Sequence, residues 1–150
     1  MSKVFYIKRP GIRNTFSTFK NTNRSGTGFI MSILKIDNQN EIYYEFTKPK
    51  GNGHTFVFVN ALTGSTATWN GVIGDKITEE GNGFLTYNFR GQDLSKFSDE
   101  LNLDTDLIVS DLCLLLKNLK LKNVILVGLS IGGLYASVAL EKGIKCIGLV

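Results

Sequence analysis

Short apolar segments alternate with segments of helical periodicity along most of this 150-residue chain, and this order constrains its fold more than any other feature. The apolar segments have the length and the turn-residue boundaries of strands that are buried on both faces. The expected elements are a strand at 54–60, a helix at 68–80, a strand at 84–89, a helix at 104–121, a strand at 124–128, a helix at 131–142 and a strand at 145–150. This alternation predicts an α/β fold, with a mostly parallel sheet and helices on both of its faces.

An antiparallel hairpin is expected before these elements. The segments 29–36 and 41–47 are rich in β-branched and aromatic residues, and the turn-forming residues 37–40 (Asp-Asn-Gln-Asn) join them. We therefore interpret residues 31–150 as one α/β domain and residues 1–30 as a loosely ordered amino-terminal extension.

The positive charge is concentrated in that extension. Residues 1–30 contain no Asp or Glu, and their basic residues are Lys3, Lys8, Arg9, Arg13, Lys20 and Arg24. Subtracting these six charges from the formal net charge of +4 leaves about −2 for residues 31–150. A slightly acidic domain argues against nucleic acid as a partner.

The sequence indicates neither an export signal nor a membrane span, because it has no apolar run of 18 residues and no continuous apolar segment at its start. Its two cysteines, Cys113 and Cys146, lack the number and spacing of a disulfide framework. These features predict a cytoplasmic protein.

The strongest chemical signal is the segment 128–133, Gly-Leu-Ser-Ile-Gly-Gly. It forms a G-x-S-x-G pattern where the strand 124–128 meets the helix 131–142. A serine at such a junction takes a strained backbone conformation that projects its hydroxyl above the sheet edge, and the tight turn requires glycine at 128 and 132. The helix that follows directs the N–H of Ile131 and the positive end of its dipole to the same point. Ser130 is therefore predicted to be a nucleophile.

Two other interpretations of this turn remain open. The glycines could simply permit close packing of strand and helix, with Ser130 capping the helix. Alternatively, the turn could bind a dinucleotide. The dinucleotide-binding pattern, however, has a glycine at the position of Ser130, and it requires an acidic residue at the end of the following strand, which this chain lacks. We predict no cofactor and no metal site.

With these elements in place, residues 31–150 resemble the α/β-hydrolase family through three motifs in the family's order. Residues 60–64 (Asn-Ala-Leu-Thr-Gly) follow the strand 54–60, where the family has its oxyanion loop. Residues 87–95 (Tyr-Asn-Phe-Arg-Gly-Gln-Asp-Leu-Ser) look like the family's D-x-R-G-x-G-x-S segment, and the third motif is the nucleophile elbow at Ser130. The resemblance implies an α/β-hydrolase fold that reaches about its sixth strand.

Within the family, the chain looks most like the 3-oxoadipate enol-lactonase branch and its esterase-like relatives. Asn60, Leu62, Trp69 and the Gly-Leu-Ser-x-Gly-Gly elbow carry this finer likeness. The chain departs from the family where Asn88 replaces the usual aspartate and Asp93 replaces the second glycine of the arginine segment.

The resemblance implies a role for each matching residue. Ser130 would attack an ester or lactone carbonyl, and the backbone N–H groups of Leu62 and Ile131 would bind the resulting oxyanion. Arg90 would orient the loop under the site rather than contact the substrate. The implied activity is hydrolysis of carboxylic esters, lactones or thioesters through an acyl-enzyme on Ser130. The alternative is a non-catalytic protein of the same fold that binds a small apolar ligand.

The resemblance also implies catalytic groups that this sequence does not contain. The family places its triad carboxylate and histidine after the nucleophile, whereas only one helix and one strand follow Ser130 here. The single histidine, His54, is expected at the opposite end of the sheet. Asp104, Asp106 and Asp111 are interpreted as a helix cap and a solvated helix start. We therefore expect the amino-terminal part of a longer hydrolase, inactive by itself.

Overall fold

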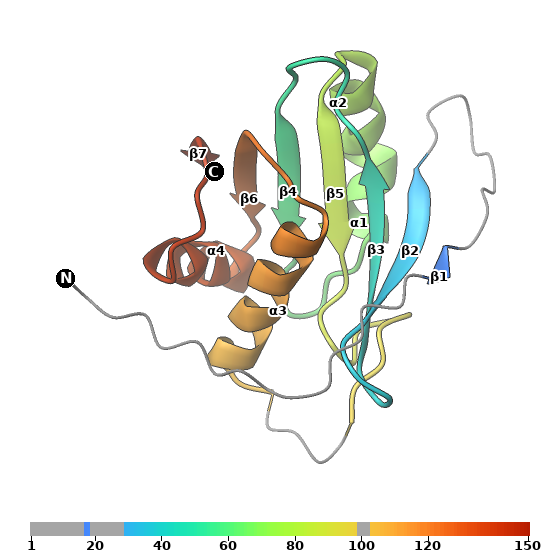
Figure 1. Cartoon of the computed structure of the whole chain (residues 1–150), viewed down its shortest axis with the longest axis vertical. Helices are drawn as coiled ribbons and strands as arrows, with labels where there is room; N and C mark the ends of the chain where they lie inside the picture. The colour runs from blue at the N-terminus through green and yellow to red at the C-terminus, as the bar shows by residue number, and fades with distance from the viewer. Residues whose placement is uncertain (1–16, 19–28, 99–102) are drawn as a thin grey trace.

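The strands of the chain form a single mixed sheet. The computed structural model describes residues 17–18, 29–98 and 103–150, and within them it contains a seven-stranded sheet of order β1-β2-β3-β5-β4-β6-β7 (Figure 1). The strands are β1 (Ser17–Thr18), β2 (Ile30–Lys35), β3 (Glu41–Thr47), β4 (Thr55–Val59), β5 (Gly83–Tyr87), β6 (Val124–Gly128) and β7 (Gly148–Leu149). The helices are α1 (Ala67–Trp69), the π-helical η1 (Asn70–Gly74), α2 (Asp75–Glu79), α3 (Thr105–Asn118) and α4 (Ile131–Glu141).

Antiparallel pairing at one side of the sheet gives way to parallel pairing at the other. β1, β2, β3 and β5 are antiparallel neighbours, whereas β5, β4, β6 and β7 run parallel. The β2–β3 hairpin turns at Asp37, whose carboxylate accepts the N–H groups of Gln39 and Asn40, each at 2.9 Å. The predicted hairpin and the predicted set of parallel strands are both confirmed.

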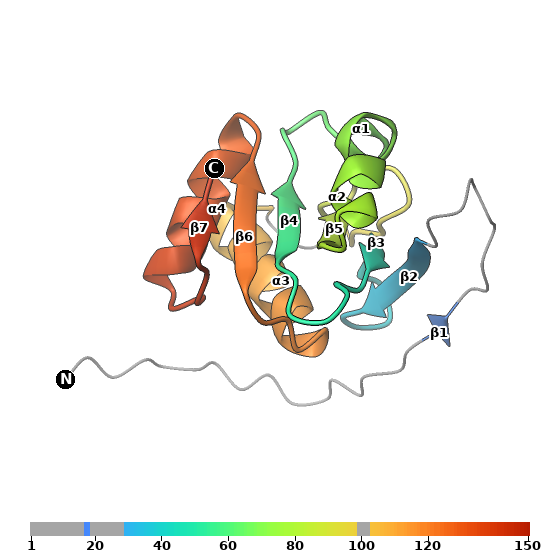
Figure 2. The same ribbon diagram turned by 90° about the horizontal axis from the view of Figure 1, so that it is seen from above.

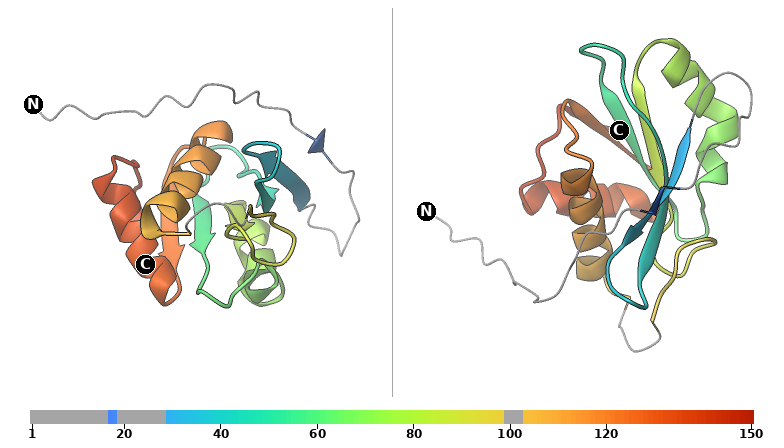
Figure 3. Two further views of the ribbon diagram at one scale, coloured as in Figure 1. Left: turned by 90° about the horizontal axis from the view of Figure 1, so that it is seen from below. Right: turned by 45° about the vertical axis from the view of Figure 1, so that its right-hand side comes forward.

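Helices cover both faces of the sheet, as the alternation of elements predicts. α3 and α4 lie on one face, and α1, η1 and α2 lie on the other (Figure 3, right). The side chains of β4 alternate accordingly. Val57 and Val59 join the core beneath α3 and α4, whereas Phe56 and Phe58 join the smaller core beneath α1 and α2. The ring of Trp69 packs on that of Phe58, with their centroids 4.6 Å apart.

Three elements differ from their predictions. The helix expected at 68–80 contains the wider turn η1, where Gly71 and Gly74 weaken the local preference for regular α-helix. The strand expected at 145–150 is ordered as a strand only at Gly148–Leu149. β1 was not predicted at all. Apart from β1 and residues 29–30, the extension predicted at 1–30 lies outside the described residues.

Two further observations concern the length of the helices and the state of the cysteines. Among the helices of the described part of the chain, none combines the length and apolarity that crossing a bilayer requires. Cys113 and Cys146 are both half-buried, and both carry free thiols.

Candidate active site

The candidate site lies where two neighbouring parallel strands end at the same level. Val59, the last residue of β4, pairs with Gly128, the last residue of β6. The chain leaves both strands at this edge, toward α1 in one case and toward α4 in the other (Figure 2). The N–H of Leu129 donates to the carbonyl oxygen of Val59 at 3.1 Å. The segment before Ser130 is therefore joined to the start of the loop that contains Leu62.

Ser130 has the strained backbone that its position predicts. Its φ of +56° and ψ of −124° lie in a region that non-glycine residues rarely occupy, and such a conformation costs about 1–3 kcal/mol. The residue is exposed and precedes α4 directly, but its side chain caps none of the helix N–H groups. The interpretation of Ser130 as a helix cap therefore finds no support in the described structure.

Glycine is required at two positions around Ser130, as predicted. A Cβ at Gly132 would lie 2.2 Å from the carbonyl oxygen of Val59 and 2.6 Å from that of Asn60. A Cβ at Gly128 would lie 2.4 Å from the Cα of Gly133. These contacts bring the first turn of α4 directly against the end of β4.

The Gly132→Ala variant is expected to lower the free energy of unfolding by about 1–3 kcal/mol, because the added methyl group overlaps backbone atoms that cannot rotate away. The matched control is Gly133→Ala in the same helical turn. A Cβ there would have Gly128 O, at 4.0 Å, as its nearest neighbour. Because alanine favours helix more than glycine does, the control should be as stable as the parent or up to about 1 kcal/mol more stable. Urea unfolding measures the free energy of unfolding of both variants. Equal values for Gly132→Ala and Gly133→Ala would contradict the tight contact at Gly132.

The two predicted oxyanion donors lie at the same sheet edge as Ser130. Ile131 is the first residue of α4, and Leu62 lies two residues beyond Asn60, whose carbonyl oxygen approaches Gly132. Neither the Ile131 N–H nor the Leu62 N–H donates a hydrogen bond within the described part of the chain. The Leu62 side chain is 62% exposed. The structure thus brings all three predicted site residues to one edge, and their chemical roles remain predictions.

Two asparagine side chains hold the loop of Leu62 at its ends. The Asn60 amide is buried, donates to the carbonyl oxygen of Tyr87 at 2.7 Å and accepts from the Trp69 indole N–H at 2.5 Å. The Oδ1 of Asn88 accepts the N–H of Thr66 at 2.8 Å. Asn88, which departs from the family pattern, therefore supplies the same kind of acceptor atom as the usual aspartate. The family pattern marks residue 88 as a departure, but nothing in the sequence indicates that its side chain anchors the loop.

A buried ion pair lies behind the turn that follows β5. The guanidinium of Arg90 donates through Nε and Nη2 to the two carboxylate oxygens of Asp111, both at 2.6 Å. Both side chains are buried. Burial raises the pKa of the Asp111 carboxyl above its usual range, and the neighbouring Arg90 opposes that rise. Arg90 thus faces the protein interior rather than solvent, in agreement with the structural role that its motif implies.

The prediction that Asp111 belongs to a solvated helix start is wrong. Asp111 follows Ile108 by three residues and precedes Leu115 by four, and both are buried residues of α3. That helical spacing is the sequence signal that could have placed Asp111 on the inner face.

The other two acidic residues of this segment behave as predicted. Asp104 caps α3 by accepting the Leu107 N–H at 2.8 Å. Asp106 is exposed and pairs with Lys142 at 2.6 Å. Lys142 is the C-cap of α4 and Ser130 is its N-cap, so Asp106 lies at the opposite end of that helix from Ser130.

The single histidine lies at the far end of the sheet, as expected. His54 immediately precedes β4, where Thr55 pairs with Val124 at the start of β6, whereas Ser130 follows the end of β6. It is exposed, and its backbone N–H donates to the Asn82 side chain at 3.1 Å. His54 is therefore not placed to act as a base toward Ser130.

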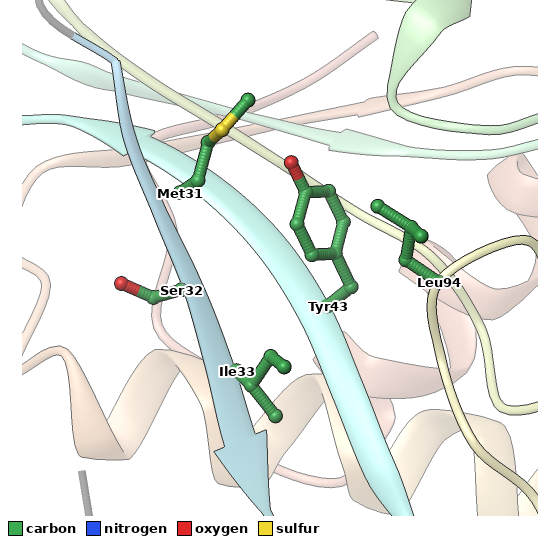
Figure 4. Close-up of a pocket in the computed structure, with 5 residues that line it drawn as sticks. All are labelled: Met31, Ser32, Ile33, Tyr43 and Leu94. Atoms are coloured by element: carbon green, nitrogen blue, oxygen red, sulfur yellow. The ribbon is translucent and has the colours of Figure 1, made fainter. Parts of the chain in front are cut away.

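Five residues line a shallow cavity of about 220 Å³ (Figure 4). Its lining residues come from β2, from β3 and from the segment after β5, and they are Met31, Ser32, Ile33, Tyr43 and Leu94. None of the three predicted site residues lines it. Among the described residues, no group of three or more His, Cys, Asp or Glu side chains is arranged to hold a metal ion.

Known structures share this arrangement of elements. No protein-family model matches the chain, and no curated protein sequence matches it. Among solved structures, it is similar to a bromoperoxidase from Bacillus anthracis, with 29% identity over 79% of this chain and a TM-score of 0.67. It is also similar to an α/β-hydrolase enzyme, MGS-M2, from a Medee basin deep-sea metagenome library, with 24% identity over 75% of this chain and a TM-score of 0.64. An esterase from Exiguobacterium antarcticum matches with 24% identity over 73% of this chain and a TM-score of 0.64.

The chain has the α/β-hydrolase fold. It spans only about two fifths of the length of these three hydrolase-fold proteins, since the matches cover 41%, 40% and 40% of their chains. The fold implied by the three sequence motifs is thereby confirmed. The finer likeness to the enol-lactonase branch stays a prediction.

Proposed function

We propose that this chain carries the nucleophile and the oxyanion donors of a serine hydrolase that acts on carboxylic esters, lactones or thioesters. The observation that carries the proposal is Ser130 itself. It is exposed, held at φ +56°, directly before a helix and beside the loop of Leu62. A strained conformation at this place costs stability, and such strain clusters at functional sites.

The proposed reaction begins with attack of the Ser130 Oγ on the substrate's carbonyl carbon. The carbonyl oxygen becomes an oxyanion, which accepts hydrogen bonds from the N–H groups of Leu62 and Ile131. The bond to the leaving group then breaks, the Ser130 proton passes to that group through a base, and water later hydrolyses the acyl-enzyme. The positive end of α4 favours the same oxyanion.

We assign the base and its carboxylate partner to residues that this sequence does not contain. The chain spans about two fifths of the matching hydrolase-fold proteins, and His54 lies at the wrong end of β4. The 150 residues alone are therefore expected to be inactive. The expected partners are small-molecule esters or lactones, and a cytoplasmic location remains a prediction from the sequence.

Treatment of the full-length protein with a fluorophosphonate tests this proposal. An activated Ser130 forms a bond to phosphorus and fluoride leaves, so mass spectrometry of the digested protein should find the adduct on the peptide that contains Ser130. Heat-denatured protein is the control, because unfolding removes the activation. Absence of the adduct from the native protein would favour the alternative, a non-catalytic protein that binds a small ligand at this edge.

A further inference from the structure

The loop of Leu62 is fixed by a side chain from the turn after β5. The Nε2 of Gln92 donates to the carbonyl oxygen of Leu62 at 2.6 Å and approaches that of Ala61 at 3.3 Å. The carbonyl oxygen of Ala61 also accepts the N–H of Gly64 at 3.0 Å. Gln92 therefore contacts the backbone on both sides of the Leu62 Cα.

One of these contacts determines where the Leu62 N–H points. The Ala61 carbonyl and the Leu62 N–H belong to the same peptide unit, which is planar and trans, so they point in opposite directions. Donors from Gln92 and Gly64 hold the Ala61 oxygen on one side of the loop. The Leu62 N–H is consequently directed to the other side, and it donates to no described residue.

The orientation of the Gln92 amide is itself determined by its partners. Its Oε1 accepts the N–H of Phe89 at 2.8 Å, and the Gln92 N–H donates to the carbonyl oxygen of Phe89 at 3.0 Å. Because the Phe89 N–H can only donate, the amide must direct its oxygen there and its NH₂ group toward the carbonyls of Ala61 and Leu62.

The turn that carries Gln92 is anchored on two further sides. Arg90, two residues earlier, forms the buried ion pair with Asp111. The Oγ of Ser95 accepts the N–H of Tyr43 and donates to the carbonyl oxygen of Asn88, both at 2.9 Å. Gln92 therefore extends from a fixed platform toward the loop.

We propose that Gln92 is a positioning residue for oxyanion binding, since it holds the Ala61–Leu62 peptide so that the Leu62 N–H faces the reacting carbonyl. This inference rests on the proposed serine hydrolase function. It requires no contact between Gln92 and substrate. N–H donors stabilise an oxyanion most when they are aligned before the negative charge develops. A freely rotating Ala61–Leu62 peptide would therefore stabilise the transition state less.

The Gln92→Glu variant of the full-length protein tests the proposal. Glutamate keeps an oxygen for the Phe89 N–H, but it places a second acceptor against two carbonyl oxygens, which it cannot bind. We expect kcat for an oxygen ester to fall about 10- to 100-fold, with KM within about twofold of the parent, because only transition-state binding changes. Gln92→Met, which has a similar length and no hydrogen-bonding amide, should behave in the same way.

Asp93→Asn is the matched control. Asp93 is exposed on the same turn, and its φ of +42° is one that asparagine adopts readily. This change removes a neighbouring charge without altering the hydrogen bonds of the Gln92 side chain to Phe89, Ala61 and Leu62, so kcat should stay within about twofold of the parent.

A thionoester substrate separates positioning from a general structural role. Its carbonyl sulfur is a weak hydrogen-bond acceptor, so its hydrolysis depends less on the oxyanion donors. Gln92→Glu should therefore lower the rate ratio of oxygen ester to thionoester by about tenfold. This ratio is independent of how much of the variant is folded.

Failure of the positioning role and failure of the proposed hydrolase function give different results. An unchanged ratio in Gln92→Glu, together with an active parent protein, would overturn the positioning role and leave the proposed function intact. A parent protein that shows neither Ser130 labelling nor ester hydrolysis would overturn the proposed function itself.

Discussion

The Ser130→Ala variant of the full-length protein is expected to lose ester hydrolysis, with kcat lowered by at least about 10⁴-fold, because no other group can form the acyl-enzyme. Initial rates with an activated ester measure the loss. Ser137→Ala is the matched control. Ser137 is an exposed serine of the same helix whose hydroxyl donates to the carbonyl oxygen of Gly133 at 2.9 Å, and its removal should leave the rate nearly unchanged. Retention of most of the activity in Ser130→Ala would refute the assignment of the nucleophile.

Stability provides a second measurement at the same position. At φ +56° a glycine is far less strained than a serine, so Ser130→Gly should be inactive yet raise the free energy of unfolding by about 1 kcal/mol. Ser130→Ala keeps the Cβ and should gain little. An equal or lower stability of the glycine variant, measured by urea unfolding, would show that the strain at Ser130 is small.

The Arg90→Met variant should lower the free energy of unfolding by about 3–5 kcal/mol at neutral pH, because it leaves the buried Asp111 carboxylate without its partner. Both groups are nearly inaccessible to solvent, with side-chain exposures of 5% and 7%. The double variant Arg90→Met/Asp111→Leu removes both charges and should recover most of the loss. Urea unfolding of the full-length protein measures all three forms. A double variant no more stable than Arg90→Met would contradict this cause.

The loss in Arg90→Met should also depend on pH. Burial already raises the pKa of Asp111 in the folded state, and removal of Arg90 would raise it further. The folded protein then binds a proton that the unfolded chain releases, so stability falls as pH rises from the unfolded value through the folded one. The destabilisation should thus be largest near neutral pH and smaller near pH 4. A pH-independent difference between variant and parent would argue against an unpaired carboxylate.

The architecture could be predicted from the sequence because local patterns determine it. The segments 54–60, 84–89 and 124–128 are largely apolar because helices bury both faces of the strands that they form. The observed strands β4, β5 and β6 match these segments to within a residue or two. The wider turn of η1 could not be predicted in the same way. A Cβ at Gly74 would lie only 3.3 Å from the rings of Phe29 and Phe84, and Phe29 is distant in sequence.

The candidate site was predictable only in part, for a similar reason. The elbow is a local feature, since its strained serine and tight glycines lie within a few residues of one another. The groups that hold the loop of Leu62 and the turn after β5 come from segments that are distant in sequence. The helical spacing of Asp111 indicates the inner face of α3, but the spacing does not reveal its partner Arg90, which is 21 residues away. Gln92 carries no signal because it binds backbone carbonyls rather than a recognisable side chain.

The position of Trp69 has a practical consequence for optical measurements. It is the only tryptophan of the chain, and its indole N–H donates to Asn60 at the start of the loop that holds Leu62. Within this sequence, fluorescence excited at the red edge of the absorption band therefore comes from one ring next to the candidate site. A molecule that displaces this loop should change the emission, so that occupancy can be followed without attaching a dye.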